Sequence, residues 1–271
     1  MKGTVLANGT SKRAGSAGPH SCLRSRSLRA VLAGLMLLAG TTGIWAQGVT
    51  PAPAPSDCEQ DNVASLAVRA CTYLLSLLDL SPEDRLRILN RRGQAWLVED
   101  DPEAAAEDFS KALSLEPGNV NALKGRVESY DRLGKFDLAV QDWTTLIALS
   151  PSDDKLLRNR GASYRGAKNY SLALADYAKS LQVNPKGLDA YIGRALVYDA
   201  MGERDKALKE FEAGIAVDDK YLLLFWERAR MVDRWGEKQQ AINDYIAVLK
   251  INGHWANARK HLERLGVYSP Y

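Results

Sequence analysis

Oppositely charged side chains recur along most of this chain at intervals of 34 residues. Five arginines share one recurring position and five acids share another: Arg92, Arg126, Arg160, Arg194 and Arg228, with Asp108, Asp142, Asp176, Glu210 and Asp244. Two interpretations are open: a charged ladder that binds a ligand, or structural pairs within or between neighbouring repeats. Guanidinium groups bind carboxylates in a bidentate geometry that ammonium groups cannot match. The strict use of Arg in every repeat therefore favours a structural role.

The remaining polar residues do not assemble a catalytic site. Beyond the N-terminal segment the histidines are His254 and His261, and no Cys or acid completes a metal set with them. The glycines follow the repeat and its turns rather than forming a phosphate-binding loop, and no nucleophile–histidine pair can be built. We expect no catalytic residue, no metal, no cofactor and no enzymatic activity.

Residues 1–46 have the composition of a secretory signal. A basic stretch without acids precedes the apolar run 30–40, and the segment ends on the small residue Ala46, as signal-cleavage sites do. The run is shorter than the roughly 20 apolar residues that a membrane-spanning helix needs. An uncleaved membrane anchor is therefore the less favoured alternative. We expect cleavage after Ala46 and an exported protein, either periplasmic or secreted.

Cleavage at that point would reverse the sign of the net charge. The whole chain has 36 basic and 33 acidic residues and a formal charge of +3, and the signal contains six of the basic residues and no acid. The mature chain would therefore carry a charge of −3 and lack the overall basic footprint that is typical of nucleic-acid-binding proteins. We expect no nucleic-acid partner.

A 34-residue period organises the rest of the chain. After a Pro- and Ala-rich linker at 47–57, alanines recur without insertion at Ala105, Ala139, Ala173, Ala207 and Ala241. An aromatic residue follows each alanine four residues later: Phe109, Trp143, Tyr177, Phe211 and Tyr245. Each period holds two stretches with helical spacing, joined by a polar turn. One such helix pair cannot bury its apolar face alone, so stacked pairs must share a continuous core.

The period, the helix–turn–helix layout and the residue types together resemble the tetratricopeptide repeat family. The family's pattern of small, aromatic, Ala and Pro residues at fixed offsets occurs five times, with local departures, at 86–119, 120–153, 154–187, 188–221 and 222–255. The resemblance implies an all-α fold. Its form would be a right-handed α-solenoid of five 34-residue helix–turn–helix repeats, with an N-terminal helical cap and a C-terminal capping helix.

Continuing this register outward assigns the two ends. Residues 58–85 become a degenerate N-terminal helical unit, in which "VRACTYLLSLLDLSPED" is the second helix and its exit turn. Cys71 takes the Ala position and Cys58 lies beside the small position of a shortened first helix, where paired helices come closest. In an oxidising compartment this predicts a Cys58–Cys71 disulfide, with two reduced, buried cysteines as the alternative. Residues 256–271 are expected to form a capping helix and tail.

The resemblance also implies where a ligand would bind, because ligands of this family usually lie along the concave face lined by first helices. Carried over by register, the predicted partner-binding residues are Lys124, Arg158, Arg165, Ile192, Leu196, Trp226 and Arg230. Ile192, Leu196 and Trp226 are apolar where the core does not require it, which resembles an interaction hot spot. The carboxylate clamp of some family members is not expected, because Glu128 stands where an Asn is needed. Alternatively, the groove is filled by the chain's own linker or tail.

The sequence therefore predicts an exported scaffold or adaptor that binds a protein or peptide partner in its concave groove. One alternative is an envelope-associated glycan- or peptidoglycan-binding accessory subunit of an enzyme, since Trp226 could stack on a sugar. Another is a self-associating structural solenoid. Membrane association is expected only if the signal is not cleaved, and the oligomeric state is not predicted.

Overall fold

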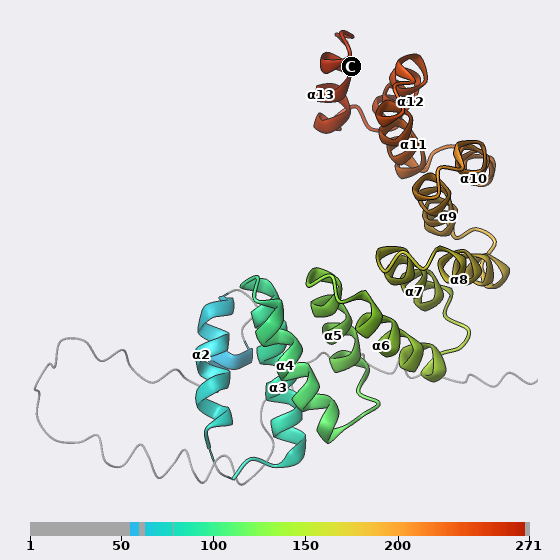
Figure 1. The fold of residues 1–271 in the computed structure, drawn as a ribbon. Helices are drawn as coiled ribbons and strands as arrows, with labels where there is room; N and C mark the ends of the chain where they lie inside the picture. Colours follow the sequence, from blue (N-terminus) through green and yellow to red (C-terminus); the bar gives the residue numbers. More distant parts are fainter. Residues whose placement is uncertain (1–54, 60–62, 78, 269–271) are drawn as a thin grey trace, which may run out of the picture. The chain divides into compact units, whose positions relative to one another are not determined.

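The computed structural model describes residues 55–59, 63–77 and 79–268. The predicted signal, most of the linker and the end of the tail lie outside these ranges. Within them the chain forms the short 3-10 helix η2 (Pro55–Glu59) and twelve α-helices, with no strand, so the predicted all-α fold is confirmed. The α-helices, which Figure 1 colours in chain order, are α2 (Ala64–Leu75), α3 (Pro82–Val98), α4 (Pro102–Leu115), α5 (Val120–Arg132), α6 (Phe136–Leu149), α7 (Asp154–Gly166), α8 (Tyr170–Val183), α9 (Leu188–Ala200), α10 (Arg204–Val217), α11 (Leu222–Arg234), α12 (Lys238–Ile251) and α13 (Ala256–Arg264).

The helices come in pairs that reproduce the 34-residue period. The second helices α4, α6, α8, α10 and α12 begin at Pro102 and every 34 residues after it, and the first helices from α5 to α11 keep the same interval. Each helix packs against the next one along the chain, and neighbouring first helices such as α3 and α5 also touch. This consecutive packing is the solenoid arrangement that the sequence predicted.

The first pair departs from its predicted boundary, because α3 begins at Pro82 rather than at residue 86. The Ser81 hydroxyl accepts a hydrogen bond from the Asp84 N–H at 3.0 Å and donates one to the Asp84 carboxylate at 2.8 Å. Pro82 stands in the first turn, where a missing N–H costs nothing. The segment "SPED", expected to be an exit turn, therefore starts a helix.

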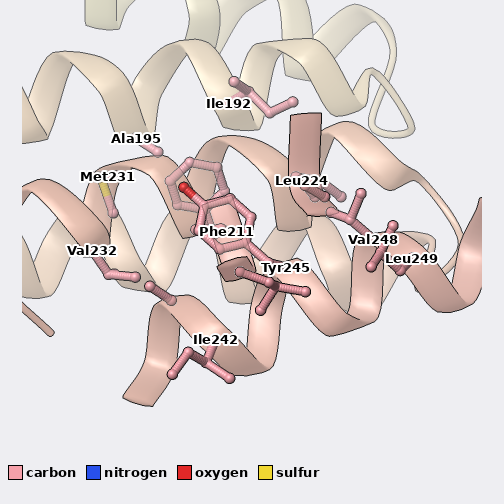
Figure 2. Packing of buried hydrophobic residues seen from close by; sticks show 14 of the residues in the cluster. Ile192, Ala195, Phe211, Leu224, Met231, Val232, Ile242, Tyr245, Val248 and Leu249 are labelled. Atoms are coloured by element: carbon pink, nitrogen blue, oxygen red, sulfur yellow. The ribbon is translucent and has the colours of Figure 1, made fainter. Parts of the chain in front are cut away.

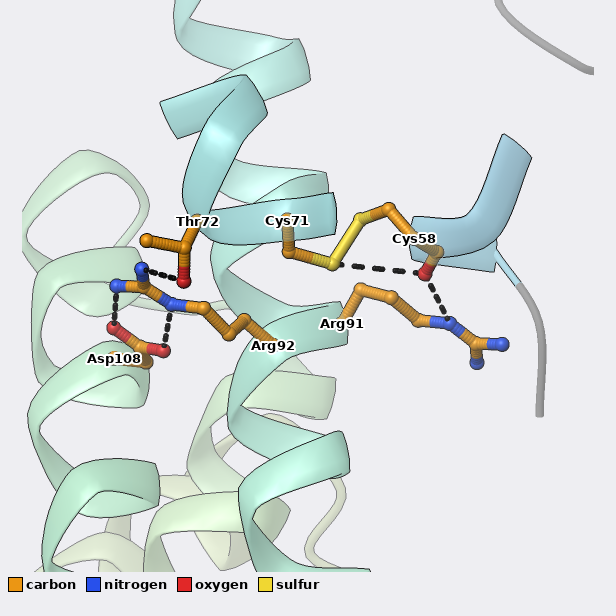
Figure 3. The surroundings of a disulfide bond; sticks show 6 residues. All are labelled: Cys58, Cys71, Thr72, Arg91, Arg92 and Asp108. Atoms are coloured by element: carbon orange, nitrogen blue, oxygen red, sulfur yellow. Dashed lines mark hydrogen bonds and ion pairs between the residues drawn. A yellow bond between two sulfur atoms is a disulfide. The ribbon is translucent and has the colours of Figure 1, made fainter. Parts of the chain in front are cut away.

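Two buried cysteines join η2 to α2 in the N-terminal unit. Cys58 and Cys71 lie as a disulfide pair with their sulfur atoms 2.08 Å apart and their Cα atoms 4.9 Å apart. Figure 3 shows that Arg91 of α3 donates from Nε to the Cys58 carbonyl oxygen, at 3.1 Å. The cysteines thus lie where the degenerate first unit meets the first regular helix pair.

Glycines let the first helices approach each other around the repeat aromatics. Phe109 lies between α3 and α5, where a Cβ added to Gly93 or Gly125 would stand 2.8 or 2.2 Å from its ring. Tyr177 lies in the same way between Gly161 and Gly193, at 3.1 and 2.4 Å. At Gly93, Gly125 and Gly193 a Cβ would force the ring or a helix to move, and at Gly161 the Tyr177 ring would have to shift slightly.

The C-terminal helices share a larger core, which α13 completes. Figure 2 shows Phe211 and Tyr245, both fully buried, at the centre of this cluster. Ala258 and Leu262 of α13 are also fully buried and belong to the same cluster. The helix therefore covers the apolar side of the last pair, as predicted for a cap.

Candidate functional site

The recurrent charges form five ion pairs, each joining the first and second helices of one unit. The pairs are Arg92–Asp108, Arg126–Asp142, Arg160–Asp176, Arg194–Glu210 and Arg228–Asp244, with closest N–O distances of 2.7 Å. The four aspartates accept two hydrogen bonds each, from Nε and from a terminal nitrogen of the arginine. These are the bidentate pairs for which Arg is suited.

Three of these arginines also reach back to the preceding second helix. Arg92 donates to the Thr72 hydroxyl at 2.9 Å (Figure 3), and Arg126 and Arg160 donate to hydroxyls of Ser110 and Thr144 at 3.1 and 3.0 Å. Hydrogen bonding to the aspartates raises the pKa of Arg126 and Arg160, so both stay cationic. Each of these side chains therefore joins its own helix to two others, which is the arrangement of an internal clamp.

A groove of about 590 Å³ opens between the first helices α7, α9 and α11. Its lining consists of Arg165, Asp189, Ile192, Leu196, Asp199, Ala200, Leu223, Glu227, Arg230 and Arg234. Four of the seven predicted partner-binding residues are in this set: Arg165, Ile192, Leu196 and Arg230. The structure thus brings charged ends and aliphatic side chains of three consecutive units to one surface.

The predicted apolar hot spot is corrected by the packing. Ile192 is only 8% exposed and belongs to the C-terminal core (Figure 2), and Leu196 packs against that core from the groove side. Trp226 does not line the groove. Its ring lies 5.7 Å from Tyr245, 5.9 Å from Trp255 and 5.6 Å from His261, measured between ring centroids. Trp226 is therefore part of the contact that holds the cap.

Lys124 and Arg158 also lie outside the groove lining. Lys124 is exposed on α5. Arg158 pairs with Asp189, whose other carboxylate oxygen accepts a hydrogen bond from the Tyr221 hydroxyl at 2.6 Å. Burial and the Asp189 charge raise the pKa of Tyr221 to about 12, so the phenol remains a donor.

Leu223, Glu227 and Arg234 line the groove without having been predicted. Leu223 and Glu227 belong to α11, a first helix, so the register alone could have placed them near it. Arg234 donates to the Asp199 carboxylate at 2.6 Å. The spacing of 35 residues, one repeat plus one residue, is the signal that could have found this pair.

The described residues show little that could support other chemistry. No group of three or more His, Cys, Asp or Glu side chains among them could hold a metal ion. His261 stacks on Tyr245 with ring centroids 4.9 Å apart, whereas His254 is exposed before α13 begins. Within the same described ranges, no helix has the length and apolar character needed to cross a membrane.

Comparison with known proteins identifies the class of this fold. Two models described as tetratricopeptide repeat match residues 125–190 and 188–221. A solved tetratricopeptide repeat protein from Parabacteroides merdae ATCC 43184 is similar over 74% of this chain and 82% of its own, at 23% identity and a TM-score of 0.60. A thermophilic TPR protein of Thermus thermophilus is similar over 68% and 98%, at 22% identity and 0.52. Residues 125–221 thus match tetratricopeptide repeats, and the solved structures share the fold of the helix pairs.

The curated relatives add a local match only. The chain is 36% identical over 63 residues to peptidyl-prolyl cis-trans isomerase D of two Cryptococcus neoformans strains. This match covers 23% of the chain and 17% of the length of those isomerases, and it lies in the repeat region. It therefore concerns the repeat scaffold, which is generally not enzymatic in this family.

Proposed function

We propose that this chain is an exported scaffold that binds a protein partner through the groove between α7, α9 and α11. Tetratricopeptide repeat proteins generally mediate protein interactions. The observation that carries the proposal is the groove itself, in which Leu196 and Leu223 lie beside charged side chains of the same helices. Apolar contacts surrounded by polar groups are the usual composition of a protein-binding surface.

Site-specific photo-crosslinking in the native cell tests this proposal. A crosslinker at Leu196 lies in the groove, whereas one at the exposed Lys209 of α10 lies on a second helix and serves as the control. We expect one partner to be trapped from position 196 and not from 209. The purified partner should then bind the chain, and Leu196→Arg should abolish that binding.

Two outcomes would contradict the proposal. If position 196 traps only the chain's own linker or tail, the groove is occupied internally. If the purified partner binds Leu196→Arg as well as the parent chain, recognition takes place elsewhere. Trp226→Ala should lower stability through the cap contact, and it also removes the ring over which Arg230 of the groove lining lies at 5.8 Å.

The proposal of export rests on the N-terminal sequence and on the cysteine pair. The signal-like segment precedes the folded unit, and a Cys58–Cys71 disulfide would persist in an oxidising compartment. N-terminal sequencing of the protein isolated from its own cells should give Gln47 as the first residue. A chain that still begins at Met1 would contradict cleavage.

A further inference from the structure

The charges that line or border the groove do not balance. Three ion pairs bring oppositely charged groups together there: Arg158–Asp189, Arg230–Glu227 and Arg234–Asp199. The fourth cation is Arg165, near the end of α7. No carboxylate in the described parts of the chain forms an ion pair with it. One positive charge of the groove is therefore left without an anion.

Arg165 lies near a neutral side chain, the phenol of Tyr177. Its Nε is buried and has no hydrogen-bond acceptor among the described residues. Burial raises the pKa of the nearby Tyr177 phenol, and the charge of Arg165 partly offsets the effect. A neutral phenol beside the guanidinium does not neutralise its charge.

The repeat register shows that packing does not require a cation at this position. The equivalent residues in the second, fourth and fifth units are acids: Asp131, Asp199 and Asp233. Each accepts a hydrogen bond from the following helices, namely from Ser163, from Trp235 and from Tyr245. The third unit alone replaces this acid with a base, and that base faces the groove.

We propose that the groove selects a peptide segment carrying an Asp or Glu side chain, which binds Arg165, next to an aliphatic side chain that contacts Leu196 and Leu223. This inference rests on the proposed function and adds the class of partner sequence. Arg forms short, bidentate, charge-assisted hydrogen bonds with a carboxylate. The three paired cations leave the rest of the groove neutral, so the preference is for one acid at one place rather than for an acidic peptide in general.

Selection from a displayed library of random twelve-residue peptides tests the inference. The target is the processed protein, purified from the cells in which it naturally occurs. We expect enriched peptides to share one acidic position at a fixed distance from an aliphatic residue. Replacing that acid by its amide should weaken binding about tenfold or more, the loss expected for a charge-assisted hydrogen bond. Arg165→Gln should produce the same loss, and Lys209→Gln, which removes a positive charge from α10, should not.

Reversing the charge at position 165 distinguishes a lost contact from a misfolded Arg165→Gln variant. Arg165→Glu should reject the acidic peptides and regain affinity for the same peptides with Lys in place of the acid. If peptides are enriched without a shared acid, or bind Arg165→Gln as well as the parent chain, this inference is overturned while groove binding stands. If no peptide is enriched above the starting library, the proposed function fails with it.

Discussion

Asp131 lies at the end of a hydrogen-bond chain that starts at an indole. Trp143 donates from Nε1 to the Ser163 hydroxyl at 3.1 Å, and that hydroxyl donates to Asp131 at 3.0 Å. Burial raises the pKa of Asp131 above 3.8, although the hydrogen bond from Ser163 lowers it. The folded chain therefore binds this proton more tightly than the unfolded chain does. Once the pH exceeds the folded-state pKa, the ionised carboxylate lowers the free energy of unfolding.

Asp131→Asn should consequently stabilise the protein at pH 7. The amide oxygen can still accept the hydrogen bond from Ser163, and the partly buried charge is gone. We expect a gain of less than about 1 kcal/mol, because the carboxylate is partly solvated, and the gain should shrink as the pH falls toward 3.8. Urea denaturation at a series of pH values measures it. A loss of stability at pH 7 would show that the fold uses the negative charge.

Arg160 shows the opposite case, a charge that the fold needs. It binds both oxygens of Asp176 at 2.7 and 2.8 Å, and Asp176 is only 6% exposed. Arg160→Ala should reduce the free energy of unfolding by about 3 kcal/mol, because it leaves a buried carboxylate without its partner. Arg160→Met combined with Asp176→Leu should recover much of the loss. Urea denaturation measures these changes, with the exposed Lys209→Ala as the control. If Arg160→Ala and Lys209→Ala lower the free energy of unfolding equally, Arg160 is not a clamp.

For single residues, the sequence predicts which positions recur but not which other side chains bury them. The arginine and acid positions could be found by their period, and the structure pairs them. Trp226 was expected to be an exposed anchor because it lies on a first helix. It is only partly buried, and that partial burial depends on Trp255 and His261, which the cap brings onto it. Exposure of a single residue is decided by such distant partners, and the period contains no information about them.

The helix pairs of the repeat are set by a few residues at their contacts and turns. The 34-residue period predicts where the second helices begin, since their interval never changes. The start of α3 at Pro82 could not be obtained from the period, because a local cap at Ser81 overrides it. Local hydrogen bonds to the first free N–H groups decide where a helix begins.

Gly125 tests the close approach of α3 and α5. A Cβ at this position would lie 2.2 Å from Phe109, so Gly125→Ala must displace the ring or separate the helices. We expect the free energy of unfolding to fall by about 2 kcal/mol or more, the usual cost of overpacking. Gly118→Ala is the matched control, because its Cβ would meet nothing within 4 Å. Thermal denaturation compares the two, and equal effects would rule out the steric explanation.

Lys168 tests the turns between paired helices. The turn residues Asp100, Gly134, Lys168, Gly202 and Gly236 all have positive φ. Lys168, at φ 61°, adopts a conformation that costs a side-chain-bearing residue about 1–2 kcal/mol. Lys168→Gly should therefore raise stability by about 0.5 kcal/mol after the entropy cost of Gly is included. Gly134→Ala, with open space around its Cβ, should lower stability in the same thermal denaturation experiments. If Gly134→Ala raises stability, the positive φ is not what limits the choice of residue in these turns.

Across the whole molecule, each described helix contacts mainly its immediate neighbours and the next first helix. Stability is then expected to be local as well, since the contacts of the described helices are mainly between near neighbours along the chain. The chain-wide solenoid follows from the period, because every unit repeats the same contacts. The groove does not follow from the period, because its volume depends on which side chains of three units are small or paired.

Removing the cysteine pair should reveal this locality. Thiol titration of the denatured protein with and without reductant first establishes the disulfide. Cys58→Ser combined with Cys71→Ser should then cost about 3 kcal/mol, the value expected for a loop of roughly 15 residues. Amide hydrogen exchange should accelerate in α2 and α3 and stay unchanged in α9 to α12. Acceleration throughout the chain would mean that the solenoid opens as one unit.

The neighbour-to-neighbour packing has a further consequence for the rate at which the chain folds. Proteins dominated by contacts between residues close in sequence fold quickly, because little entropy is lost before a contact forms. Here each helix pair can complete its contacts as soon as the adjoining pair is in place. Folding can start at any pair and spread in both directions, so an apolar helix face never waits for a partner from the far end of the chain.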